Sequence, residues 1–261
     1  MNNTRLLIIS GMHRSGTSLL AGWLQRCGLD VGDQLLPGNF SNARGHFEDE
    51  DIMRFQQDLM LRKGIHVFPK SAEVPVDESD ESELQALLAS KYVAKSVAGF
   101  KDPRTCLFLN QLWANVLPDA YSIFIFRHPK QVIASLEKRE EYMMHRSGLL
   151  KTLKWNAMRF KWLKRFEKAY VFYNKQLLEY ASARPERSVI LELAELEAQA
   201  PLGLNILNRW GFDLNAVPIQ EVKDDSLFTS TALKPLTIPL QQQTIDVYNQ
   251  LKELSKRSLE Q

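Results

Sequence analysis

Near the N-terminus the sequence reads Gly11-Met12-His13-Arg14-Ser15-Gly16-Thr17-Ser18. The apolar run 6–9 precedes this stretch, and a helical pattern over 19–24 follows it. A short strand, a glycine-bounded turn and a helix start, in that order, bring unpaired backbone N–H groups and the positive end of a helix dipole to one point. The stretch therefore predicts a cradle for an anion, and phosphate is the expected ligand.

This stretch differs from the Walker A loop of a nucleotide triphosphatase at one position. Gly11 and Gly16 stand in the Walker A register, but Thr17 occupies the place of the lysine that would reach the β- and γ-phosphates. The best candidate for a strand that ends in a magnesium-binding aspartate, 121–126, ends in Arg127 instead. Because an arginine binds anions and repels a cation, we expect no metal site here.

Arg127 belongs to a second candidate anion site. Pro129 suits the first turn of a helix, where its missing N–H costs nothing. Arg127 is therefore expected at the carboxyl end of a strand, with Ser135 about two turns along the next helix. Open parallel sheets bind ligands at those carboxyl ends. Arg127 can offer a bidentate fork to a phosphate, and Ser135 can add a hydroxyl donor.

The two motifs together resemble those of the sulfotransferase superfamily, whose members use 3'-phosphoadenosine 5'-phosphosulfate (PAPS) as sulfuryl donor. In that family a loop formed by a basic residue, a small residue, glycine, threonine and a hydroxyl residue binds the 5'-phosphosulfate. The matching residues here are Arg14, Ser15, Gly16, Thr17 and Ser18. An arginine after a strand and a serine eight residues later bind the 3'-phosphate in the family, and Arg127 and Ser135 match them.

The rest of the chain indicates an α/β fold. Strand-like runs alternate with longer helical patterns, which is typical of parallel βαβ units. These runs cover 6–10, 96–100, 121–126 and 188–193. We therefore expect three layers, α/β/α, around a central parallel sheet, which is the P-loop NTPase-like sulfotransferase fold that the resemblance implies. A length of 261 residues with 44% hydrophobic content suits a single domain over 1–261.

Between the strand-like runs, the sequence indicates a connector and several helices. Residues 66–83 contain two prolines and an acidic cluster ahead of a predicted helix over 84–92, and they indicate a solvated surface connector or an acceptor-side lid. Residues 151–180 predict one long amphipathic helix, whose apolar stripe is expected to pack on the core and whose basic face could attract an anionic acceptor. A final helix is predicted over 241–257.

Charge and cysteine content limit the partners. A net charge of +2 is too mild to indicate nucleic-acid binding. No apolar run is long enough to span a bilayer or to form a secretory signal, so we expect a cytoplasmic protein without an integral membrane segment. Cys27 and Cys106 lack metal-site spacing and are expected to be buried thiols.

The resemblance also implies a base for the acceptor. Branches of the superfamily that act on carbohydrates or tyrosine use a glutamate from the region after the first helix, and within 42–51 the run Gly45-His46-Phe47-Glu48-Asp49 looks like that element. Glu48 is the predicted base. His46 is the alternative, because an imidazole titrates near neutrality. The acidic residues here could instead simply begin the next helix, since carboxylates in a first turn complement its dipole.

A cation for the leaving group is expected at Lys101. The run Lys101-Asp102-Pro103 resembles an element of tyrosylprotein and related sulfotransferases whose lysine assists the leaving group. Arg14 is the second cation at the catalytic centre, and Arg104 could bind an anionic donor or acceptor. In the phenol and steroid branch a histidine stands where this chain has Pro103, so the sequence favours the branch with a glutamate base.

The sequence thus predicts a sulfotransferase that moves a sulfuryl group from PAPS to a hydroxyl or amine by in-line transfer, without a required metal. The resemblance favours a carbohydrate or glycoconjugate acceptor, while a peptide, a lipid or a small metabolite stays open. A P-loop kinase for a small molecule and a non-catalytic nucleotide-binding module are the alternatives. The family's late glycine-rich basic segment has no counterpart after Val222, and the adenine-stacking residue is unassigned.

Overall fold

A four-stranded parallel sheet forms the centre of the protein, in the order β2-β1-β3-β4. The computed structural model describes residues 4–36, 45–69, 74–222 and 238–261. The strands are β1 (Arg5–Ser10), β2 (Val97–Lys101), β3 (Tyr121–Phe126) and β4 (Ser188–Glu192). Each lies within one residue of the run predicted for it, and the predicted α/β class is confirmed.

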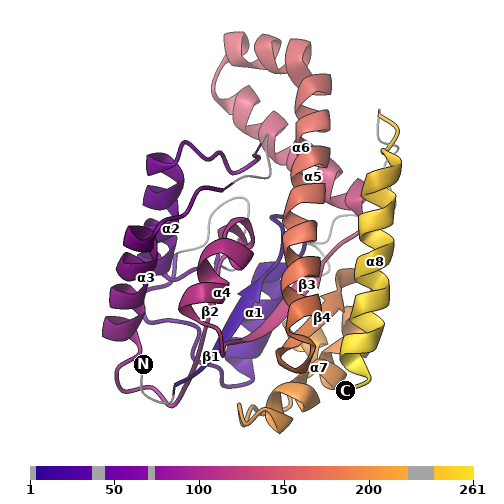
Figure 1. The fold of residues 1–261 in the computed structure, drawn as a ribbon. Coiled ribbons are helices and arrows are strands. Elements are labelled where there is room, and N and C mark those ends of the chain that lie inside the picture. Colours follow the sequence, from indigo (N-terminus) through magenta and orange to yellow (C-terminus); the bar gives the residue numbers. More distant parts are fainter. Residues whose placement is uncertain (1–3, 37–44, 70–73, 223–237) are drawn as a thin grey trace.

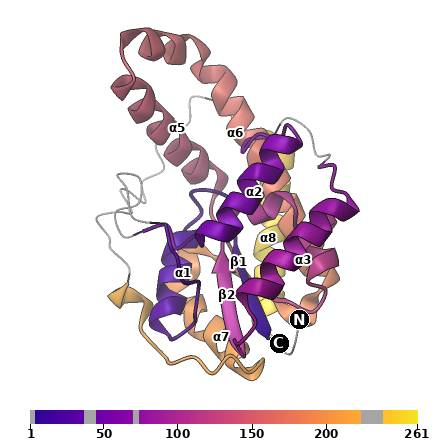
Figure 2. The same ribbon diagram turned by 90° about the vertical axis from the view of Figure 1, so that its left-hand side faces the viewer.

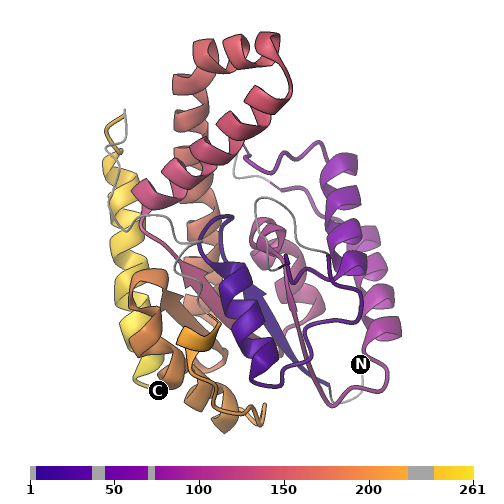
Figure 3. The ribbon, with the colours of Figure 1, turned by 180° about the vertical axis from the view of Figure 1, so that it is seen from behind.

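Helices cover both faces of this sheet (Figures 1 and 3). Along β1, Leu7 and Ile9 pack against one layer of helices, and Leu6 and Ile8 pack against the other. The first layer holds α1 (Thr17–Arg26) and α7 (Leu196–Arg209). The second holds α2 (Glu50–Arg62), α3 (Glu78–Lys91), α4 (Ala114–Val116), α5 (Pro129–Arg146), α6 (Leu149–Ala183) and α8 (Gln242–Leu259). The predicted three-layer arrangement is therefore present.

The strand order creates a switch point of the sheet between β1 and β3. The chain passes from β1 to β2 on one side and then returns to β3 on the other side of β1. Ligands of open parallel sheets bind where the connections diverge in this way, outside the carboxyl ends of the strands. The loop after β1 and Arg127 after β3 both lie at that point.

Helices α5 and α6 form a hairpin that projects beyond the carboxyl edge of the sheet (Figures 1 and 2). Pro129 occupies the first turn of α5, as predicted. The predicted long helix is α6, whose 35 residues correspond to about 52 Å. No helix within the described ranges combines the length and the apolar character that crossing a membrane requires.

The predicted start of α3 was wrong. This helix begins at Glu78 rather than at Leu84, because Asp77 caps it. The Asp77 carboxylate accepts hydrogen bonds from the N–H groups of Ser79 and Asp80, and the Asp80 side chain accepts one from the Asp77 N–H. The acidic cluster therefore forms the first turns of a helix instead of a connector.

Candidate functional site

The loop between β1 and α1 is shaped by two glycines. A Cβ atom at Gly11 would lie 2.2 Å from the carbonyl oxygen of Ile125, so only glycine lets the loop leave β1 so close to β3. Gly16 precedes α1 with a φ of 97° and supplies no side-chain cap. The first-turn N–H groups of α1 are therefore not capped by a side chain, as an anion-binding helix start requires. The Ser15 hydroxyl in the same loop is buried and has no hydrogen-bond partner among the described residues.

The two predicted anion motifs meet beside this loop. The Arg14 Nε donates to the Ser135 Oγ at 2.9 Å, and the Arg127 Nη1 donates to the Arg14 carbonyl oxygen at 3.3 Å. Burial, together with the nearby charges of Arg139 and Arg127, lowers the pKa of Arg14 to about 10. Guanidinium groups gathered in this way create a strongly positive, partly buried site, which favours an anion.

A buried ion-pair network lies on the other side of the loop. The Lys101 Nζ lies 2.8 Å from Glu48 Oε1, and the Arg104 Nη2 lies 2.5 Å from Glu48 Oε2. Asp102 holds Arg104 in place, since its carboxylate accepts from the Arg104 Nε and Nη2, each at 2.8 Å. All four side chains are buried. The fold brings Glu48 and Lys101 together from positions 53 residues apart in the sequence.

Lys101 connects this network to the loop 11–16 and the first turn of α1, which are together called the anion loop. Its Nζ also donates to the Ser18 Oγ at 3.2 Å, in the first turn of α1, and to the His46 carbonyl oxygen at 2.8 Å. Glu48, Lys101 and Ser18, which were predicted from three separate segments, therefore form one continuous cluster. The His46 imidazole is half-buried, and the hydrogen bond to Lys101 is made by the backbone oxygen of this residue.

The charges of the network set the state of Glu48. Burial by itself raises the pKa of this carboxyl group, but the charges of Lys101 and Arg104 outweigh it and lower the pKa to about 2. Glu48 is thus ionised at neutral pH. A carboxylate with so low a pKa accepts a proton poorly until one of its two cations moves away.

His13 adds a neutral imidazole to the same region. Its Nε2 is buried without a hydrogen-bond partner within the described part of the chain. The rings of Phe68 and Tyr173 lie edge-on to it, with centroid distances of 6.5 and 5.9 Å. Burial and the charge of Arg104 lower the pKa of His13 to about 3, so it stays uncharged at neutral pH.

Two features of the site were not predicted. Arg139 lies one helical turn after Ser135, and that four-residue spacing was the available signal. The pairing of Arg104 with Glu48 joins residues 56 positions apart and has no local signal.

Within the described ranges, no group of three or more His, Cys, Asp or Glu side chains could hold a metal ion. Both cysteines are free and buried, as predicted.

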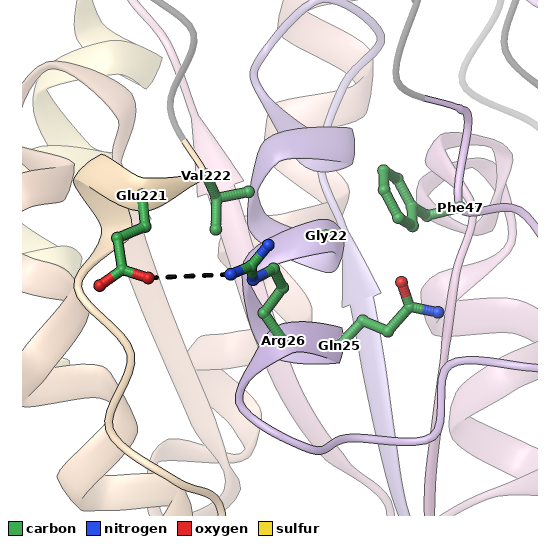
Figure 4. A pocket seen from close by; sticks show the side chains of 6 residues that line it. All are labelled: Gly22, Gln25, Arg26, Phe47, Glu221 and Val222. Carbon is green, nitrogen blue, oxygen red and sulfur yellow. Dashed lines mark ion pairs between the residues drawn. The ribbon is translucent and has the colours of Figure 1, made fainter.

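A separate cavity of about 380 Å³ lies along α1 (Figure 4). Gly22, Gln25 and Phe47 line it, as do Arg26 and Glu221, which form an ion pair of 3.7 Å. None of the predicted site residues lines this cavity.

Parts of three predicted features lie outside the described residues: 42–44 of the base segment, 70–73 of the connector, and 223–237 after Val222.

Comparisons with known proteins show a shared fold. No family model matches this sequence, and no curated protein matches it. A solved sulfotransferase domain from the curacin biosynthetic pathway superposes with a TM-score of 0.50, covers 95% of this chain and 97% of its own, and is 15% identical. A sulfotransferase from Alicyclobacillus acidocaldarius gives a TM-score of 0.49 over 98% and 97% of the two chains, also at 15% identity.

Proposed function

We propose that the protein is a PAPS-dependent sulfotransferase that transfers a sulfuryl group to a hydroxyl or amine. One observation carries the proposal: the Lys101 ammonium donates hydrogen bonds both to Glu48 and to Ser18 in the first turn of α1. A cation and a carboxylate are thus placed directly beside an anion cradle, where a sulfuryl group and its acceptor would meet. The fold shared with a sulfotransferase domain supports the same function.

The residues present fit the donor. Ser15 has a buried hydroxyl without a partner among the described residues, and α1 begins without a side-chain cap, which suits a phosphosulfate. The 5' end would be held by Arg14, Ser15, Gly16, Thr17 and Ser18. Arg127 and Ser135 would hold the 3'-phosphate. Bound PAPS supplies the sulfuryl group and leaves as a bisphosphate.

Lys101 and Glu48 divide the chemistry between them. Lys101 can donate either to Glu48 or to an oxygen on which negative charge develops in the anion loop. When it turns toward the loop, Glu48 loses one of its two cations and its pKa rises, so that it can accept the proton of the acceptor. Arg104, fixed by Asp102, keeps the carboxylate oriented. His46 is the alternative base.

The two other candidate functions differ in the residues that they need. A kinase would need a lysine where the buried Thr17 stands and a carboxylate where Arg127 follows β3. A module without catalysis would keep the anion loop and use the Glu48 pair only for structure. A carbohydrate or glycoconjugate acceptor, the single-domain arrangement and the cytoplasmic location remain predictions.

Transfer of radiolabel from PAPS to a panel of a saccharide, a tyrosine peptide and an aliphatic alcohol tests this function. The wild type is expected to label at least one acceptor, and Lys101→Ala is expected to lose most of that activity. Lys95→Ala is the matched control, because Lys95 is paired with Asp30 and Asp33 at the surface. Equal labelling by Lys101→Ala, or transfer of the γ-phosphate of ATP instead, would overturn the proposal.

A further inference from the structure

A groove of about 690 Å³ lies between α5 and α6 in the projecting hairpin. Its walls are rich in methionine and tryptophan side chains: Met143, Met144, Trp155, Met158 and Trp162. The volume is within the range of small-molecule binding sites, and flexible methionines adapt to irregular apolar ligands. None of the residues assigned to the donor site lines the groove.

The inner end of the groove lies next to the candidate active site. Arg139 lines the groove one turn beyond Ser135, whose hydroxyl bonds to Arg14. The charge of Arg139 acts on both Arg14 and His13 and lowers the pKa of each. On the α6 side, the Trp162 ring lies 6.4 Å from the ring of His66 and 5.8 Å from that of Phe166. A ligand in the groove would therefore reach the active site with one end.

The outer end of the groove is positively charged. Arg139, at the inner end, forms an ion pair with Glu140 at 2.7 Å, but Lys151 and Lys154, near the start of α6, have no acidic partner in the described part of the chain. Exposed leucines at 149, 150 and 153 adjoin these lysines. The surface thus combines cations with open apolar area at the mouth and apolar walls within.

Trp155 provides an independent sign of a ligand. The residue is only 2% exposed, and its indole Nε1 is buried without a hydrogen-bond partner among the described residues. A buried donor left without a partner is costly, so such groups usually have an acceptor in the functional state. A ligand oxygen near Lys154 would supply that acceptor.

We propose that the groove binds an amphiphilic acceptor: an apolar chain with an anionic group at one end and the sulfuryl-accepting hydroxyl at the other. The anionic group lies at Lys151 and Lys154, the chain lies among the methionines and tryptophans, and the hydroxyl points past Arg139 toward His13. Trp162 lies eleven residues after Lys151 on α6, so the groove is about 16 Å long. The assignment as acceptor rests on the proposed function and narrows its substrate class to lipid-type molecules, including glycoconjugates that carry a lipid chain.

Binding of ω-hydroxylaurate below its micelle concentration, followed by calorimetry and by tryptophan fluorescence, tests the inference. The wild type is expected to bind the probe saturably. Met158→Glu should weaken binding by about tenfold or more, because it puts a charge among apolar walls. Lys151→Ala with Lys154→Ala should weaken binding by roughly threefold to tenfold. Leu202→Glu, an exposed apolar position on α7, is the control and should bind like the wild type.

Trp155→Phe keeps an aromatic ring but removes the N–H group, and it should bind more weakly while its melting temperature is retained. Equal binding by Met158→Glu and wild type would overturn the inference, as would no saturable binding or binding to anionic vesicles but not to the monomeric probe. A separate titration with 3'-phosphoadenosine 5'-phosphate keeps the two proposals distinguishable. If the bisphosphate binds and the probe does not, the proposed amphiphilic acceptor is wrong and the proposed sulfotransferase function stands. If the probe binds and the bisphosphate does not, the groove binds a ligand, but the ligand is not a sulfuryl acceptor.

Discussion

The Lys101 ammonium lies 2.8 Å from the Glu48 carboxylate, and only 1% and 10% of the two side chains are exposed. In so dry an environment the nearby ammonium strongly favours the ionised form of the Glu48 carboxyl group and lowers its pKa. The same ammonium reaches the first turn of α1 through Ser18. An anion bound in the loop therefore competes with Glu48 for Lys101, and this competition couples anion binding to the basicity of Glu48.

Replacing Glu48 with glutamine removes the proposed base with little change in shape. Sulfuryl transfer should fall by about 10²- to 10⁴-fold, the usual contribution of a positioned base. Affinity for 3'-phosphoadenosine 5'-phosphate should be at least that of wild type, because the neutral glutamine no longer competes by charge with the bound anion for Lys101. Steady-state rates and calorimetry on the same preparations measure the two quantities. Asp58→Asn, an exposed carboxylate on α2, which begins two residues after Glu48, is the control, and unchanged transfer in Glu48→Gln would exclude this base.

The low pKa of Glu48 predicts a specific loss of stability in acid. Its pKa falls from 4.5 to about 2 on folding, so between these values the unfolded chain binds more protons and stability increases with pH. The stabilisation is complete above about pH 4.5 and is lost as the pH falls toward 2. The difference in unfolding free energy between wild type and Glu48→Gln should therefore shrink from pH 5 to pH 3 in urea titrations. A difference independent of pH would contradict the ion-pair geometry.

His13 predicts a second loss of stability in acid, which begins at a higher pH than the loss caused by Glu48. Burial lowers its pKa from 6.5 to about 3, so the folded state binds fewer protons than the unfolded state between these values. Stability should decrease as the pH falls below 6.5, with a slope of up to about 1.4 kcal/mol per pH unit. His13→Gln should have a smaller slope than the wild type between pH 6.5 and 5, and the remaining slope comes from His46 and His128, whose pKa values burial also lowers. The exposed His145→Gln should keep the slope of the wild type, and identical slopes in both variants would show that His13 titrates freely.

Alanine at Gly16 should damage both stability and anion binding. The position has a φ of 97°, and a Cβ would lie 2.8 Å from Leu193 Cδ1. Left-handed strain and this contact together should cost about 1–3 kcal/mol and shift the start of α1. Gly64→Ala is the matched control, since Gly64 also has a positive φ but has no neighbour within 4 Å of a new Cβ. Equal bisphosphate affinities in both variants would contradict the role of the loop.

The strands could be predicted, and the two motifs proposed to bind anions could be located next to them, because these signals are local. Buried parallel strands are continuous apolar runs, and Arg127 and Ser135 share one strand-helix junction. The bond between Arg14 and Ser135 could not be predicted, because it joins two motifs 121 residues apart. The same holds for the second cation that contacts Glu48, since Arg104 lies 56 positions away in the sequence and reaches Glu48 through the tertiary structure alone.

Periodicity predicted α6 but not its surroundings. Its inner half packs on the core through Phe166, Tyr170 and Tyr173, as an apolar stripe predicts. In its outer half the apolar residues Leu150 and Leu153 are exposed, because the hairpin extends past the sheet that would cover them. A helical period shows which residues share a face, and only the tertiary structure decides what that face contacts.

Calorimetric titration with 3'-phosphoadenosine 5'-phosphate tests the central claim most directly. The wild type should bind this bisphosphate tightly, and Arg127→Ala should lose most of the affinity. Arg187→Ala, at a partly exposed arginine directly before β4, should keep it. Magnesium ATP should compete poorly. Absence of bisphosphate binding, or preferential binding of magnesium ATP, would contradict the assignment of the donor site.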